Sequence, residues 1–103
     1  MMSNEFLNIA KEIVLNIIDK DSTSVFLFGS RADSTFRKDS DMDIGFLGKG
    51  KMDLLIFHRI REALENSSVP YHFDLVDFSY KTSEFKDIAL KNIIIWNKAK
   101  NLS

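Results

Sequence analysis

The chain has 103 residues, a formal net charge of −1 and no cysteine, and apolar residues make up 45% of it. These values predict one folded domain over residues 1–103, and they exclude disulfides, thiolate metal sites and a general nucleic-acid-binding protein, which is usually basic. Charged residues interrupt the start of the chain and no apolar run reaches about 18 residues, so we expect neither a signal peptide nor a membrane span, and a cytoplasmic location.

The first third of the chain predicts a helix followed by a strand. Apolar residues recur at helical spacing over residues 6–18, with Ser3 or Asn4 as a candidate N-cap. Residues 25–28 form a short apolar run closed by Gly29, which is typical of a buried central strand. Residues 31–39 are mostly polar, with one phenylalanine at Phe36, and predict a loop that has room for one helical turn.

The remaining elements alternate between strand and helix. Residues 41–47 alternate between apolar and polar positions, which predicts a half-buried strand. Residues 54–64 have helical spacing with Asp53 as cap, and residues 71–78 predict a third strand. Ser83 is a candidate cap of a short helix, and residues 93–96 predict a final edge strand. This order predicts an α/β (α+β) fold, a small mixed sheet with helices packed on one face.

Three aspartates, Asp39, Asp41 and Asp43, occupy every second position around the start of the second strand. Their spacing matches the beginning of an EF-hand calcium loop. The sixth residue of such a loop should be glycine and the twelfth glutamate, but this chain has Ile44 and Gly50 there. A calcium-sensing loop is therefore rejected.

Asp41 and Asp43 should project from the same face of their strand. Two carboxylates about 4 Å apart repel by about 4 kcal/mol at an effective dielectric of about 20. A divalent cation would offset this repulsion, and oxygen ligands favour Mg²⁺ or Mn²⁺. A solvated, charged surface loop is the alternative, because aspartate is mostly exposed in proteins.

Asp74 and Asp77 compete to be the third carboxylate of such a site. Asp74 is out of step with Phe73 and Leu75, so it should leave the core face and approach Asp43 if the two strands pair. Asp77 is in step with those residues and is expected to mark the strand end, where water reaches it. We favour Asp74.

Gly29 and Ser30 follow the first strand, where glycine lets a phosphate approach the backbone and serine offers donors. A simple turn is the alternative. One of Arg31, Arg37 and Lys38 is a candidate phosphate ligand, and a solvated loop that balances nearby acids is the other interpretation.

The string "FGSRADSTFRKDSDMDI", in which ten residues separate Gly29-Ser30 from Asp41 and Asp43, resembles the signature of the polymerase β-like nucleotidyltransferase superfamily. Within it the chain resembles the minimal nucleotidyltransferases. The segments "VPYHFDLVDF" and "SEFKDIALKNIIIW" are similar to the subgroup encoded beside HEPN-domain proteins. The resemblance covers about residues 5 to 97 and implies the polymerase β-like palm fold.

The resemblance also implies a role for each matching residue. Asp41 and Asp43 would bind two Mg²⁺ or Mn²⁺ ions, and Asp74 would complete the site and act as, or orient, the general base. Ser30 and the backbone at Gly29 would hold the triphosphate of the donor, with Arg31 as a further nucleotide contact. The transferred group would be a nucleoside monophosphate, AMP from ATP.

A chain of this length leaves no room for a second domain that grips the acceptor, so a second copy or a separate protein must complete the site. The resemblance suggests a HEPN-domain toxin as partner, with AMP transferred to one of its tyrosines, which makes this chain an antitoxin. One alternative is a non-catalytic antitoxin that masks its partner. A second is a transferase of small molecules such as antibiotics.

Overall fold

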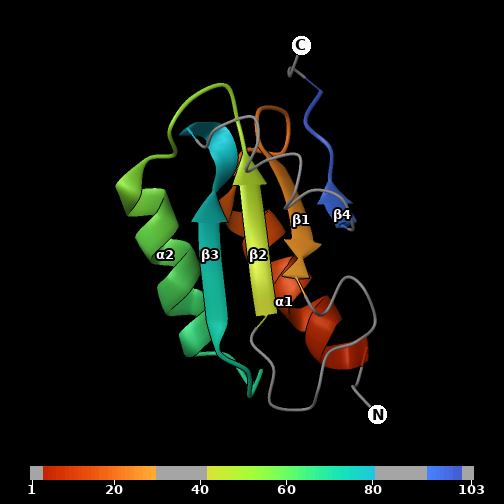
Figure 1. The fold of residues 1–103 in the computed structure, drawn as a ribbon. Helices are drawn as coiled ribbons and strands as arrows, with labels where there is room; N and C mark the ends of the chain where they lie inside the picture. The colour runs from red at the N-terminus through yellow and green to blue at the C-terminus, as the bar shows by residue number, and fades with distance from the viewer. Residues whose placement is uncertain (1–3, 30–41, 81–92, 101–103) are drawn as a thin grey trace.

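The computed structural model of the protein describes residues 4–29, 42–80 and 93–100. In these residues the strands form one four-stranded sheet in the order β3-β2-β1-β4 (Figure 1). The elements in chain order are α1 (Asn4–Ile17), β1 (Ser24–Phe28), β2 (Met42–Leu47), α2 (Leu54–Glu65), β3 (Phe73–Asp77), the 3₁₀ turn η2 (Phe78–Tyr80) and β4 (Ile94–Asn97). Each predicted strand lies within two residues of its expected bounds at either end. The short helix predicted after Ser83 falls outside the described residues.

The sheet is mixed, as the sequence predicts. Strand β1 is antiparallel to both β2 and β4, whereas β2 and β3 are parallel and are connected through α2. Parallel neighbours need a crossover of this kind, because a tight hairpin can join only antiparallel strands. The apolar run of β1 is therefore an inner strand, and β4 lies at the edge of the sheet.

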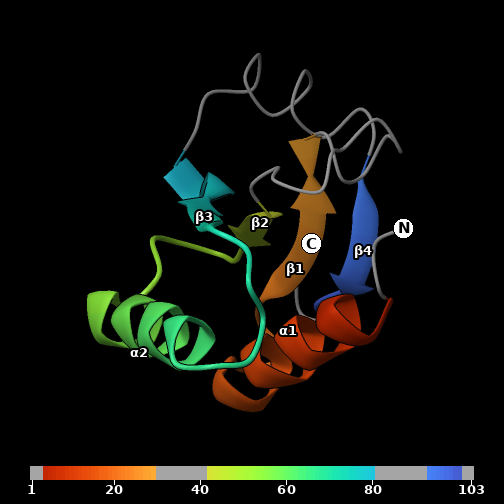
Figure 2. The same ribbon diagram turned by 90° about the horizontal axis from the view of Figure 1, so that it is seen from below.

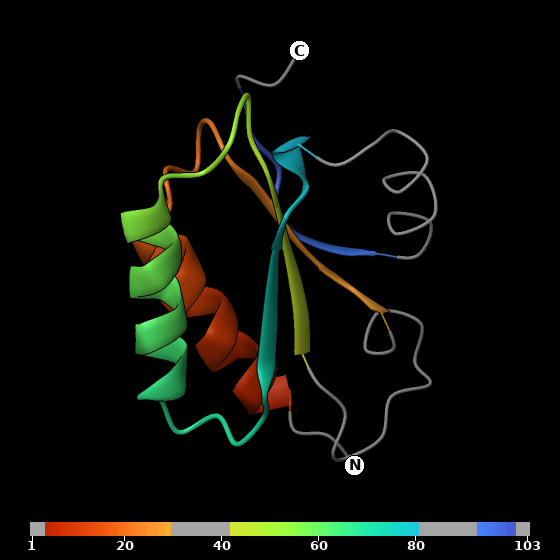
Figure 3. The ribbon, with the colours of Figure 1, turned by 60° about the vertical axis from the view of Figure 1, so that its left-hand side comes forward.

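Both helices cover the same face of the sheet, which we call the helix face (Figures 2 and 3). The apolar stripe of α1 packs there with one side of α2 and the inward side chains of three strands. Asp53 begins α2 as predicted, because its side chain accepts a hydrogen bond from Leu55 N at 2.8 Å. The fully buried side chains of this core include Val14, Leu27, Met42, Ile44, Phe46, Ile60 and Leu64.

The opposite face of the sheet, which we call the second face, carries an aromatic cluster formed by Phe26, Phe28 and Phe78. The ring centroid of Phe78 lies 5.3 Å from that of Phe26 and 5.2 Å from that of Phe28. Gly45 makes room for this cluster, since a Cβ at that position would collide with the Phe26 ring and lie 2.9 Å from Cε1 of Phe78. The aromatic cluster therefore packs directly over the backbone of β2.

Within the part of the chain that the structure describes, no helix has the length and apolar character needed to cross a bilayer.

Candidate active site

The candidate site begins with two aspartates on neighbouring strands. Asp43 of β2 and Asp74 of β3 are register partners in the parallel pair, so their side chains leave the same face of the sheet. That face is the second face, because the flanking residues Met42 and Ile44 are buried in the core on the helix face. Asp43 is half-buried and Asp74 is exposed. The two strands do pair, which is the condition under which Asp74 was expected to approach Asp43.

The backbone of Gly29 lies beside the Asp43 carboxylate. Gly29 follows the last residue of β1 and has φ = 77°, a conformation that residues with a side chain rarely adopt. A Cβ on Gly29 would collide with Oδ2 of Asp43 and would lie 3.2 Å from its Cγ. The backbone at the end of β1 therefore lies directly against the Asp43 carboxylate, an approach that only glycine permits.

Asp77 has a structural role. It is 7% exposed, and its carboxylate accepts hydrogen bonds from Met52 N at 2.7 Å and from Ser79 N at 3.0 Å. The expectation that water reaches Asp77 is wrong, because these bonds hold the carboxylate inside the loop that leads into α2. A buried carboxylate satisfied in this way fastens the loop and the η2 turn to the end of β3.

Several predicted site residues lie outside the described residues: Ser30, Arg31 and Asp41, together with Arg37 and Lys38. Their assigned roles stay predictions. Among residues 4–29, 42–80 and 93–100, no group of three acidic, histidine or cysteine side chains is arranged to hold a metal ion. The structure thus brings together Gly29, Asp43 and Asp74 of the predicted set.

Two paired carboxylates on one sheet face fit a hard divalent cation. Neighbouring strands lie about 4.8 Å apart, so the two negative charges repel at a distance where a cation between them lowers the energy. The ligand atoms are all oxygen, the set that Mg²⁺ or Mn²⁺ accepts. Asp43 and Asp74 are the described residues that could hold such an ion.

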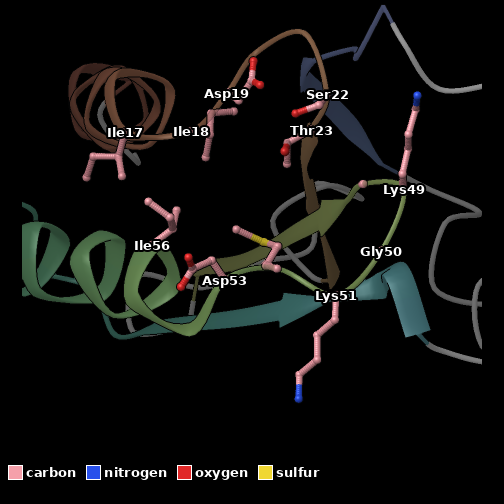
Figure 4. Close-up of a pocket in the computed structure, with 12 residues that line it drawn as sticks. Ile17, Ile18, Asp19, Ser22, Thr23, Lys49, Gly50, Lys51, Asp53 and Ile56 are labelled. Atoms are coloured by element: carbon pink, nitrogen blue, oxygen red, sulfur yellow. The ribbon is translucent and has the colours of Figure 1, made fainter.

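A cavity in the described part of the chain is a separate feature. It has a volume of about 400 Å³ and lies between the α1–β1 turn and the loop that leads into α2 (Figure 4). Lys49 and Lys51 extend away from it in Figure 4. The cavity lies near the end of β2 at Leu47, which pairs with Ser24 of β1. Asp43 lies near the other end of β2 and pairs with Phe28. The cavity and the carboxylate pair therefore lie at opposite ends of β2, about 13 Å apart along the strand.

Comparisons with known proteins identify the family and the fold. The family model described as polymerase β nucleotidyltransferase matches residues 8–101. The probable protein adenylyltransferase MntA of Haemophilus influenzae is 29% identical to this chain over 102 residues, which is 98% of this chain and 88% of that protein.

Two solved structures share the fold. A toxin–antitoxin crystal structure with AMP-PNP has a TM-score of 0.68 at 19% identity, and the match covers 92% of this chain and 73% of that one. A complex of a tri-AMPylated Shewanella oneidensis HEPN toxin with its MNT antitoxin has a TM-score of 0.58 at 16% identity, covering 86% and 70%. From the family match over most of its length, this chain belongs to the polymerase β nucleotidyltransferase family of enzymes.

Proposed function

We propose that the protein is an adenylyltransferase that moves AMP from ATP to a tyrosine hydroxyl of a HEPN-domain toxin, and that it acts in this way as the antitoxin of the pair. The observation that carries the proposal is the register of Asp43 with Asp74 on the second face, with Gly29 against the Asp43 carboxylate. Two similar proteins support the donor and the partner, since MntA of Haemophilus influenzae is named a probable protein adenylyltransferase and one structure of the same fold is an MNT antitoxin in complex with an AMPylated HEPN toxin.

The proposed reaction transfers one nucleotidyl group. The acceptor oxygen attacks the α-phosphorus of ATP, the bond from that phosphorus to the β-phosphate bridging oxygen breaks, and pyrophosphate leaves. Asp74 is exposed on the second face and takes up the proton of the attacking hydroxyl, or orients it. The attacking and leaving oxygens lie roughly in line in such a transfer, so the main task of the protein is to position both substrates.

The donor phosphates are assigned to the end of β1. The backbone of Gly29 is open to close approach because it has no side chain, and Ser30 and Arg31 follow it in the chain. Two divalent ions held by Asp41, Asp43 and Asp74 would supply positive charge against the charge that builds on the phosphoryl oxygens. Because Asp43 lies next to Gly29, a metal ion bound to Asp43 would lie close to the donor phosphates.

The test is transfer of label from ATP to the purified HEPN-domain partner in the presence of Mg²⁺. Label in the α-phosphate is expected to appear on the partner, whereas label in the γ-phosphate is expected to leave with pyrophosphate. Transfer of the γ-label would indicate a kinase instead. If neither label reaches the partner, although the two proteins form a stable complex, the result would favour an antitoxin that only masks the toxin.

A further inference from the structure

Phe28 completes a row of three side chains across the second face. It is the register partner of Asp43 in the antiparallel pair of β1 and β2, and Asp43 is the register partner of Asp74 in the parallel pair of β2 and β3. Directly opposed residues of an antiparallel pair have Cβ atoms about 5 Å apart. A group bound at the Asp43 carboxylate therefore lies within reach of the Phe28 ring.

The Phe28 ring is held in place and yet remains partly open. It meets Phe78 edge to face, with ring planes at 88° and centroids 5.2 Å apart. Phe78 is fully buried and Phe26 is 3% exposed, whereas Phe28 is half-buried. The same aromatic cluster thus contains two closed rings and one ring with free surface, and the open ring is the one beside Asp43.

The direction of the in-line transfer determines which substrate contacts the exposed part of the Phe28 ring. If the phosphates of ATP lie at Gly29, the leaving pyrophosphate points beyond the end of β1, and the attacking oxygen approaches from the other side. The helix face is closed by α1 and α2 (Figure 3). The acceptor would therefore reach the carboxylate pair over the second face, where Phe28 lies beside Asp43.

We infer that Phe28 is an acceptor-binding residue whose ring packs against the aromatic ring of the tyrosine that receives AMP. The inference rests on the proposed function. A tyrosine brings a flat apolar ring beside a polar hydroxyl, and an aromatic partner favours such a ring in an edge-to-face or offset arrangement. A serine or threonine acceptor would gain much less from this contact, so Phe28 contributes selectivity for tyrosine.

The experiment compares Phe28→Leu with Phe26→Leu, which removes a ring of the same cluster at a closed position. Initial rates of label transfer are measured at saturating ATP while the concentration of the HEPN partner is varied. Phe28→Leu is expected to raise the KM for the partner by about three- to tenfold, the size of one aromatic pair. The Kd for Mg²⁺ and ATP should not change. Phe28→Tyr, which keeps the ring, should restore the KM.

The control separates a binding role from a structural one. Phe26→Leu is expected to lower the melting temperature at least as much as Phe28→Leu, with no change in the KM for the partner. An unchanged KM in Phe28→Leu, or an equal rise in Phe26→Leu, would overturn the inference while the proposed function stands. Wild-type protein that transfers no label would overturn the proposed function, and the inference with it.

Discussion

Asp43 and Asp74 lie directly opposite each other on the parallel strands β2 and β3, and both side chains leave the sheet face that the helices do not cover. Like charges directly opposite each other on neighbouring strands repel. A divalent cation between the two carboxylates would offset this repulsion.

Removal of the divalent cation should stop the reaction. With excess EDTA, transfer of α-label from ATP to the HEPN partner is expected to fall to background, and added Mg²⁺ or Mn²⁺ should restore it, because the carboxylate pair offers only oxygen ligands. Zinc or calcium, added in place of Mg²⁺ or Mn²⁺ after EDTA treatment, serves as the control that tests which ions restore label transfer. Full transfer in EDTA would contradict a metal-dependent site.

Asp74→Asn should mainly reduce the rate of AMP transfer, whereas Asp77→Asn should mainly reduce the stability of the protein. Asp74 is exposed, so Asp74→Asn should change the free energy of unfolding by less than about 0.5 kcal/mol and reduce transfer by at least about a hundredfold. Asp77 is buried and accepts two backbone hydrogen bonds. Asp77→Asn replaces one accepting oxygen with a donor and should destabilise the protein by about 1–3 kcal/mol. Denaturant unfolding and label transfer measure the two effects, and the reverse pattern would assign the catalytic role to Asp77.

Gly29→Ala should damage both the fold and the site. The new Cβ would have to share space with the Asp43 carboxylate, and alanine disfavours the positive φ of this position. We expect a loss of about 1–3 kcal/mol in stability and at least a tenfold loss in the rate of transfer, since Asp43 must move. Gly50→Ala is the matched control, because a Cβ there meets nothing within 4 Å. Equal effects at both positions would show that the contact with Asp43 is unimportant.

Gly45→Ala tests the aromatic cluster on the second face. A Cβ at this position would press into the rings of Phe26 and Phe78, and overpacking of a filled site costs about 1–3 kcal/mol. Thermal unfolding should therefore occur at a temperature lower by at least about 4 °C. The double variant Gly45→Ala with Phe26→Leu should lose less stability than the sum of the two single variants, because the smaller side chain at position 26 leaves room for the new Cβ. Losses that simply add would mean that the strain has another source.

Much of the fold followed from hydrophobic periodicity. The alternation in residues 42–47 and the helical stripes of α1 and α2 are local patterns, and each predicts which side chains face the core. The cap at Asp53 and the edge position of β4 are confirmed as well. Asp74 is out of step with Phe73 and Leu75, and this predicted that its side chain leaves the core face of the sheet. The register of β2 with β3 then places it opposite Asp43.

The remaining features depend on contacts between distant segments. The role of Asp77 comes from backbone donors at Met52 and Ser79, which a strand pattern alone does not indicate. The alternation of β2 shows that Gly45 faces away from the core, but only the approach of Phe26 and Phe78 explains why a glycine is there. The position of Phe28 beside Asp43 likewise required the antiparallel register of β1 with β2.

The most direct test of the central claim is the intact mass of the HEPN-domain partner after co-expression with this protein. We expect the partner to gain the mass of one or more AMP groups with the wild-type chain and none with Asp43→Asn, although the variant still binds the partner. An unmodified partner beside the wild-type chain, or an equal gain with Asp43→Asn, would contradict transfer of AMP at this site.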